Sequence, residues 1–262
     1  MQFPPLVEAQ FLTRLNRFAA LVLLDGREVM VHVANSGRMR ELLQPGNTCY
    51  LSHHSGSHRK TAYDLILVAI DRNRPFSISE EKQPYYSESD PSQYPPVQQK
   101  GTGSTLSLVS ADSRVPNALI WDTWREGVLP HFDGYTDGRR EVTFHDSRFD
   151  MMLQGPSGLC YMEMKSVTLV MGGIARFPDA PTERGRKHIG TLVKAVQEGQ
   201  RAAAIFVIQR DDATGLSPYD NNDPEFGAAL RGAVDSGVEA YAFTCALARE
   251  AITIAGEVPV LL

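Results

Sequence analysis

The sequence has few cysteines, no long apolar run and no leader-like beginning. Its three cysteines, Cys49, Cys160 and Cys245, lie far apart and are odd in number. This argues against a disulfide framework or a cysteine-based zinc site, and it predicts buried thiols. No apolar stretch approaches the ~18 residues that a membrane-spanning helix needs, and residues 1–5 do not resemble a signal peptide. We therefore expect a cytoplasmic protein that does not bind membranes.

Motifs that read DNA bases are also lacking, because no helix-turn-helix or similar pattern occurs, so a sequence-specific repressor is not expected. The net charge of −5 argues against a protein coated in basic charge. The charge is uneven, however, since residues 1–75 carry nine Lys and Arg against six Asp and Glu. A mildly basic front and an acidic remainder predict two parts with different tasks.

The first part, residues 1–75, is predicted to form a small closed β-barrel, of which the oligonucleotide-binding (OB) fold is one kind. A hairpin turn at Asp25-Gly26 separates two strand-like segments. Residues 35–43 are expected to make one or two helical turns before Pro45-Gly46. The predicted strands cover residues 19–24, 28–33, 48–51 and 63–70.

Residues 76–104 are rich in turn residues without apolar periodicity, which predicts a linker or surface insertion. Residues 105–262 alternate strand and helix patterns, which predicts an α/β domain. Its expected helices cover 117–127, 182–197 and 223–235, and its expected strands cover 106–109, 141–144, 148–153, 159–169, 201–209 and 238–244.

Three residues of this second part have the chemistry of a metal site: Asp150, Glu163 and Lys165. Residues two apart in a strand project from the same face, so Glu163 and Lys165 point together. If residues 148–153 and 159–169 form a hairpin, Asp150 reaches the same place. Two carboxylates and a lysine make a site for a hard cation, Mg²⁺ or Mn²⁺, beside a group that can handle a proton.

Phosphodiester hydrolysis uses these groups, because the metal neutralises the phosphate and acidifies water while a lysine orients the water or stabilises the transition state. An exposed strand face that carries a Glu–Lys ion pair is the alternative interpretation of the same spacing.

The sequence resembles the SfsA (sugar fermentation stimulation protein A) family along nearly its whole length. The resemblance rests on uncommon motifs in the same order. These are residues 14–18 (RLNRF), 32–39 (HVANSGRM), 59–61 (RKT), 116–117 (PN), 147–150 (SRFD), 163–170 (EMKSVTLV) and 177–185 (FPDAPTERG), followed by His188.

This resemblance implies an N-terminal OB-fold-like barrel and a C-terminal domain like the PD-(D/E)XK nucleases. It also implies non-specific DNA binding with a proposed role in regulating sugar (maltose) metabolism. Asp150 then corresponds to the acidic residue on the second core strand, and Glu163 and Lys165 to the (D/E)XK pair. Asp122 lies where related proteins place a fourth carboxylate, usually Glu, and Glu141 is the other candidate.

Further residues are candidates for contacts to phosphate. Arg184 and His188 are four apart on one helix face, although His188 could instead cap the helix or pack against the sheet. Thr182 begins that helix, where anions bind readily, or it is a plain N-cap. Asn117 shapes a helix start or lines the site.

The basic residues of the barrel are the expected contacts to the DNA backbone, which predicts salt-sensitive binding. Phe18 or Tyr63 could stack on a base. We interpret His53, His54 and His58 as a solvated loop, because their spacing fits no closed zinc site. The set of backbone contacts is Arg14, Arg17, Arg38, Arg40, Arg59 and Lys60.

Three hypotheses follow. The chain is a DNA-binding protein with a magnesium-dependent nuclease site, a DNA-binding regulator on a nuclease-like fold without catalysis, or a hydrolase of another phosphodiester. The sequence does not determine the oligomeric state.

Overall fold

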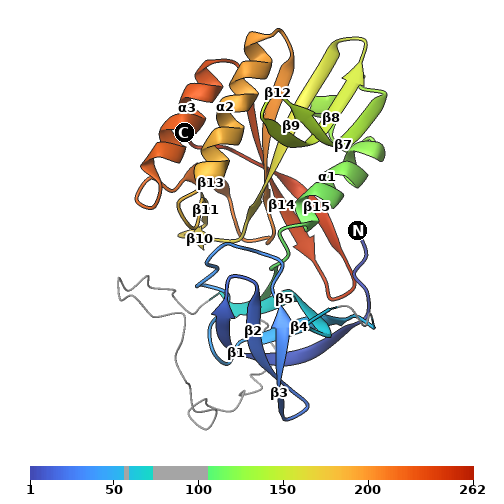
Figure 1. The fold of residues 1–262 in the computed structure, drawn as a ribbon, viewed down its shortest axis with the longest axis vertical. Coiled ribbons are helices and arrows are strands. Elements are labelled where there is room, and N and C mark those ends of the chain that lie inside the picture. The colour runs from blue at the N-terminus through green and yellow to red at the C-terminus, as the bar shows by residue number, and fades with distance from the viewer. Residues whose placement is uncertain (56–58, 73–105) are drawn as a thin grey trace. The chain divides into compact units, whose positions relative to one another are not determined.

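The computed structural model describes residues 1–55, 59–72 and 106–262. They form two compact units (Figure 1). One unit consists of Gln2–Ser113 with the turn segment Leu247–Ile252, and the other of Arg114–Ala246 with Thr253–Leu262. The linker predicted at 76–104 lies outside the described residues.

The first unit is the small closed barrel that the sequence predicts. Strands β1 to β5 pair in the order β3-β2-β1-β4-β5, and β3 closes onto β5 through the pair His32↔Asp64. Apolar residues on the inner face, such as Val22 and Val31, are fully buried. The strands are β1 (Leu6–Asn16), β2 (Ala19–Leu24), β3 (Arg27–His32), β4 (Thr48–His53), β5 (Tyr63–Asp71) and β6 (Leu106–Ser110).

The hairpin turn predicted between β2 and β3 is present. Asp25 and Gly26 both have positive φ, of 49° and 75°. A two-residue turn of this kind requires that conformation at both positions, which is why Asp-Gly is favoured there.

Of two further predictions for this part of the chain, the one or two helical turns at 35–43 are confirmed at the lower number, and the placement of the strand at 106–109 is wrong. Residues 35–43 make a single turn, closed by the N–H groups of Leu42 and Leu43 on the carbonyl of Met39. Met39 has a φ of 46°, which a continuing right-handed helix does not accommodate. The strand at 106–109 does not open the C-terminal domain, because β6 pairs with β5 and its Val109 is buried in the barrel core.

The second unit is a mixed α/β domain, as predicted. Its main sheet has the order β15-β14-β12-β9-β8-β7, with β9, β12 and β14 parallel and β7, β8 and β9 antiparallel. These strands are β7 (Asp137–Phe144), β8 (Ser147–Gly155), β9 (Gly158–Val167), β12 (Arg201–Ile208), β14 (Glu239–Leu247) and β15 (Ile252–Val258). A small second sheet consists of β10 (Val170–Met171), β11 (Ile174–Phe177) and β13 (Gly215–Pro218).

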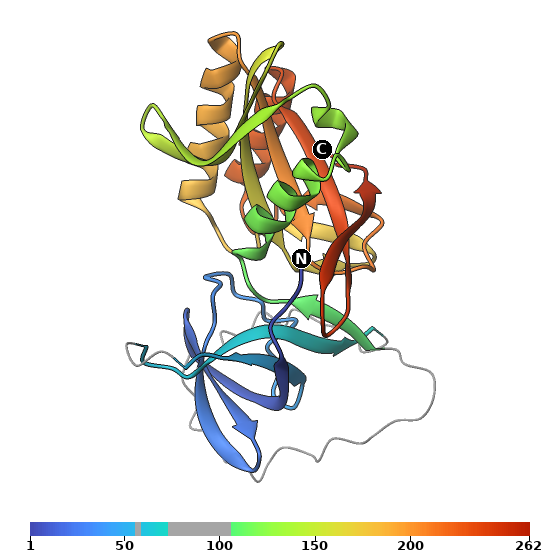
Figure 2. The same ribbon diagram turned by 90° about the vertical axis from the view of Figure 1, so that its right-hand side faces the viewer.

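Three α-helices cover the main sheet: α1 (Val115–Arg125), α2 (Glu183–Gln197) and α3 (Pro224–Asp235). Figure 2 shows α1 on one face of the sheet, with α2 and α3 on the other. A short 3-10 helix (Pro130–Phe132) precedes β7. All three α-helices lie within two residues of the predicted positions.

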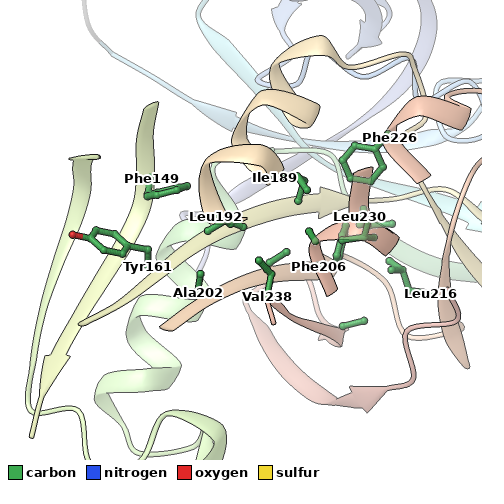
Figure 3. Close-up of a cluster of buried hydrophobic side chains, with 14 of the residues drawn as sticks. Phe149, Tyr161, Ile189, Leu192, Ala202, Phe206, Leu216, Phe226, Leu230 and Val238 are labelled. Atoms are coloured by element: carbon green, nitrogen blue, oxygen red, sulfur yellow. The ribbon is translucent and has the colours of Figure 1, made fainter. Parts of the chain in front are cut away.

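The apolar face of the sheet packs against α2 and α3 (Figure 3). Leu192 and Leu230 come from the two helices, and Phe206 comes from β12. This core fixes the position of α2 relative to β9, and so the position of His188 on α2 relative to Glu163 on β9. Within the described ranges, no helix is long and apolar enough to cross a membrane.

All three cysteines are free and buried, as predicted. Burial raises the pKa of each thiol to about 12. The thiols are therefore protonated packing groups at neutral pH.

Candidate functional site

The candidate site lies where strands β8 and β9 diverge. The two strands pair from the hairpin turn as far as Met151↔Met162. One residue further, the Asp150 side chain takes the place of the missing strand partner, because its Oδ2 accepts a hydrogen bond of 2.8 Å from the Met164 N–H. Buried backbone N–H groups need an acceptor, so the divergence itself requires a side chain of this kind at position 150.

Helix α1 holds Asp150 from the other side. The Nδ2 of Asn117 donates to Asp150 Oδ1 at 2.7 Å. Pro116 stands at the start of the same helix, where its fixed φ is compatible with the first turn. Asn117 therefore lines the site, as one of its two sequence interpretations predicted.

Glu163 and Lys165 point together from β9, as strand alternation predicts. Both are buried, with 4% and 8% of their surface exposed, so the alternative of an exposed strand face is wrong. Lys165 Nζ donates to Glu163 Oε1 at 2.8 Å, and His188 of α2 contacts the same oxygen through Nδ1. The other oxygen, Glu163 Oε2, is buried and has no hydrogen-bond partner in the described structure.

The two carboxylates differ in their electrostatics. Burial and the neighbouring charge of Glu163 raise the pKa of Asp150, although its two hydrogen bonds and Lys165 oppose this. Burial also acts to raise the pKa of Glu163, but Lys165 and His188 outweigh it, so this pKa is lowered. Glu163 is therefore the firmly ionised carboxylate, and Asp150 is the one whose charge is less well compensated.

The start of α2 positions His188. Thr182 is the N-cap, and its Oγ1 accepts from the Gly185 N–H at 3.0 Å. Asp223 accepts from the Thr182 N–H at 2.8 Å and so anchors the cap. Arg184 is exposed, and its Nε donates to His188 Nε2 at 3.5 Å. Thr182 thus serves as the plain cap, while an additional anion at this helix start stays a prediction.

Neither Asp122 nor Glu141, the candidates for an additional carboxylate ligand, contacts Asp150 or Glu163 in the described structure. Asp122 is five residues after Asn117, which places it about 140° around the helix. Glu141 is exposed and pairs with Arg148. No group of three His, Cys, Asp or Glu side chains that could hold a metal occurs among the residues described. Asp122 as a ligand therefore stays a prediction without a supporting contact.

Arg14 differs from the other basic residues of the barrel. Its guanidinium has five N–H groups, and the structure gives all five an acceptor within the protein. Arg14 is therefore a structural clamp between the β1–β2 turn and the segment before Met39, which corrects its assignment as a contact to DNA. The acceptors are the carbonyl oxygens of Asn16, Arg17, Asn35, Gly37 and Arg38.

Replacing Arg14 with lysine is expected to lower the free energy of unfolding by about 1–3 kcal/mol, because an ammonium cannot satisfy five carbonyls in a fork. Urea denaturation measures this. Arg17→Lys is the matched control on the neighbouring exposed residue, with an expected change within about 0.5 kcal/mol. Equal stability of Arg14→Lys and wild type would contradict the clamp.

Arg59 is also engaged within the barrel. It pairs at 2.5 Å with Asp64, which is only 1% exposed. His32 and His54 lie 3.3 Å and 3.2 Å from the same carboxylate. This cluster was not predicted, and its one signal in the sequence is an acidic residue within the apolar run 63–70. Arg59, which was predicted to contact DNA, therefore has a structural partner in Asp64. His54 belongs to the same cluster and is not a solvated loop residue.

The remaining basic candidates of the barrel are exposed: Arg17, Arg38, Arg40 and Lys60. Phe18, at the β1–β2 turn, is 50% exposed, and the Arg17 guanidinium lies 5.8 Å from its ring centre. An exposed ring beside exposed cations is the arrangement that stacks bases and pairs with phosphates.

Tyr63 and the neighbouring histidines are less available than Phe18 for stacking on a base. His53 is exposed and lies with its ring centre 5.1 Å from that of Tyr63, which packs in part against the barrel core. His58 lies outside the described residues. Phe18 is thus the better placed of the two predicted stacking residues.

Comparison with known proteins matches both units to one family. Residues 12–75 match the SfsA N-terminal OB domain, and residues 114–251 match the sugar fermentation stimulation protein RE domain. The sugar fermentation stimulation protein homolog of Desulforamulus reducens is 40% identical over 259 residues, with 99% of this chain and 94% of that protein covered. The homolog of Caldanaerobacter subterraneus subsp. tengcongensis is 38% identical over 258 residues, with 98% of each chain covered.

A solved structure is similar over the full length. It is that of Pyrococcus furiosus SfsA in complex with Ca²⁺, with a TM-score of 0.81, 27% sequence identity, and coverage of 100% of this chain and 98% of that one. The predicted fold, an OB barrel followed by an α/β domain, is confirmed.

Proposed function

The chain belongs to the sugar fermentation stimulation protein family, and we propose that it is a non-specific DNA-binding protein with a metal-dependent phosphodiesterase site of the PD-(D/E)XK type. The observation that carries the proposal is Glu163 Oε2. A buried carboxylate oxygen without a partner is unfavourable unless something absent from the protein itself binds it. It lies beside a second carboxylate, Asp150, and a buried lysine.

These residues fit a hard divalent cation. Mg²⁺ is commonly held by one or two carboxylates, with water and substrate phosphate completing the shell, so the pair Asp150 and Glu163 is sufficient. The Ca²⁺ complex of the Pyrococcus relative supports a cation of the same oxygen-preferring class. When bound, Mg²⁺ or Mn²⁺ would supply positive charge at the phosphate and a lowered pKa for water.

The protein's own groups have separate tasks in this proposal. Asn117 and the Met164 N–H orient the Asp150 carboxylate. Lys165 uses one Nζ–H on Glu163, and an ammonium has three, so the others are available to orient water or to stabilise developing charge on a phosphoryl oxygen. Arg184 is exposed at the start of α2, and in this proposal it binds a neighbouring phosphate.

The barrel is proposed to supply the affinity for DNA. Its exposed cations release counterions from the phosphate backbone, so binding should weaken steeply with salt and depend little on sequence. The acidic remainder of the chain makes this division of tasks necessary, because without a metal it repels DNA.

A DNA-binding regulator of sugar (maltose) metabolism without catalysis is the second candidate. It is favoured by the observation that, among the described residues, two carboxylates meet where β8 and β9 diverge, and that one of them, Glu163, is already paired with Lys165 and His188.

DNA cleavage and binding measured in one series separate the two. We expect wild type to cleave with Mg²⁺ or Mn²⁺ and to stop on addition of EDTA. Glu163→Gln should lose cleavage, while Glu225→Gln, an exposed control on α3, should retain it. Binding in EDTA without cleavage in any metal would favour the regulator.

A further inference from the structure

His188 is a buried imidazole, 6% exposed, whose two nitrogens face groups of opposite hydrogen-bonding character. We propose that it is a positioning residue that gives the two oxygens of Glu163 different tasks. In this arrangement Oε1 is held by donors from the protein, and Oε2 is presented to the metal. The inference rests on the proposed metal site and adds to it the residue that orients its glutamate.

The partners of the ring determine its tautomer. A carboxylate only accepts hydrogen bonds, so the contact to Glu163 Oε1 places a proton on His188 Nδ1. A guanidinium only donates, so Arg184 Nε requires Nε2 of the same ring to accept, at 3.5 Å. The two contacts together select the Nδ1–H tautomer, with Arg184 as the group that keeps Nε2 free of a proton.

The position of the ring is determined by α2. Its cap is tied to Asp223 through Thr182 and Arg186. Further along the helix, Ile189 and Leu192 pack into the core. A histidine at 188 therefore reaches Glu163 from a rigid element, which is what an orienting contact needs.

The contact from His188 to Glu163 Oε1 distinguishes two carboxylate oxygens that are otherwise equivalent. The terminal torsion of glutamate is broad and roughly two-fold, so a single donor, Lys165, holds either oxygen with little preference for the angle of the group. A second donor on Oε1 from another direction fixes the plane and leaves Oε2 as the free oxygen. Loss of such an orienting contact typically lowers metal affinity about 10- to 100-fold.

Calorimetric titration of the full-length protein with Mn²⁺ tests this. His188→Ala and His188→Gln are expected to bind Mn²⁺ about 10- to 100-fold more weakly than wild type. His188→Asn is expected to retain most of the affinity, because its Nδ2 takes nearly the place of the imidazole Nδ1. Wild-type affinity in His188→Ala, or an Asn variant as weak as the Ala variant, would overturn the positioning role.

A second readout needs neither a metal nor a variant. Ring ¹⁵N chemical shifts of His188 in the metal-free protein are expected to show a protonated Nδ1 and an unprotonated Nε2. The opposite tautomer would overturn the inference even if every variant failed to fold. Absence of Mn²⁺ binding by wild type, with the expected tautomer present, would count against the proposed function and leave the orientation of Glu163 by His188 standing.

Discussion

Lys165→Met is expected to lower metal-dependent DNA cleavage by about 100- to 1,000-fold, the usual effect of removing one group that stabilises transition-state charge. Methionine keeps much of the packing volume but has no charge and no donor. DNA binding in EDTA should be unchanged, because the proposed binding residues lie on the barrel. Initial rates at saturating Mg²⁺ measure the effect, and Lys194→Met on the exposed side of α2 is the matched control.

Stability must be separated from chemistry in this experiment. Removing Lys165 leaves a buried Glu163 with His188 as its one remaining partner in the described structure, and breaking one side of a buried pair costs about 3–5 kcal/mol. The double variant Glu163→Gln, Lys165→Met removes both charges and should recover most of that stability without recovering cleavage. If Lys165→Met lost cleavage only in proportion to its unfolded fraction in urea denaturation, Lys165 would be a structural residue.

The catalytic candidates were predictable because they depend on local periodicity. Glu163 and Lys165 share a face by strand alternation, and Asp150 is the first residue beyond the paired part of the β8–β9 hairpin. Sequence spacing is sufficient for such a placement. It does not reveal why the position needs an aspartate, since the Met164 N–H that the carboxylate satisfies belongs to the backbone and has no residue-type signature.

Contacts to backbone groups also explain why the structural role of Arg14 was not predicted. Arg14 looked like any basic residue of the barrel, but its acceptors are five backbone oxygens from two separate segments. Any residue type supplies a carbonyl, so no pattern marks them. The contact between His188 and Glu163 was hidden for a related reason. It depends on how α2 packs on the sheet, which is a property of the whole core rather than of either segment.

Asp150→Asn is expected to stabilise the metal-free protein by about 1 kcal/mol at pH 7.5, in the range usual for relieving a strained functional site, while abolishing cleavage. Burial and the charge of Glu163 raise the pKa of Asp150, so its ionised form destabilises the folded state at neutral pH. Asparagine keeps both contacts. Its Oδ1 accepts from the Met164 N–H, and its Nδ2 donates to Asn117 once that amide has turned over.

The stability difference between wild type and Asp150→Asn is expected to depend on pH. A carboxyl whose pKa is higher in the folded state binds its proton more tightly there, so wild type gains stability relative to the variant as pH falls from neutral toward the ordinary value of 3.8. The advantage of Asp150→Asn should therefore be largest at neutral pH and shrink as the pH falls toward 3.8, measured by urea denaturation in EDTA. Asp146→Asn is the control with the opposite sign, because a hydrogen bond from Lys187 lowers the pKa of that exposed carboxyl. A less stable Asp150→Asn at pH 7.5 would mean that the two hydrogen bonds to the carboxylate outweigh its burial, and the site would then be built to hold a charge without a metal.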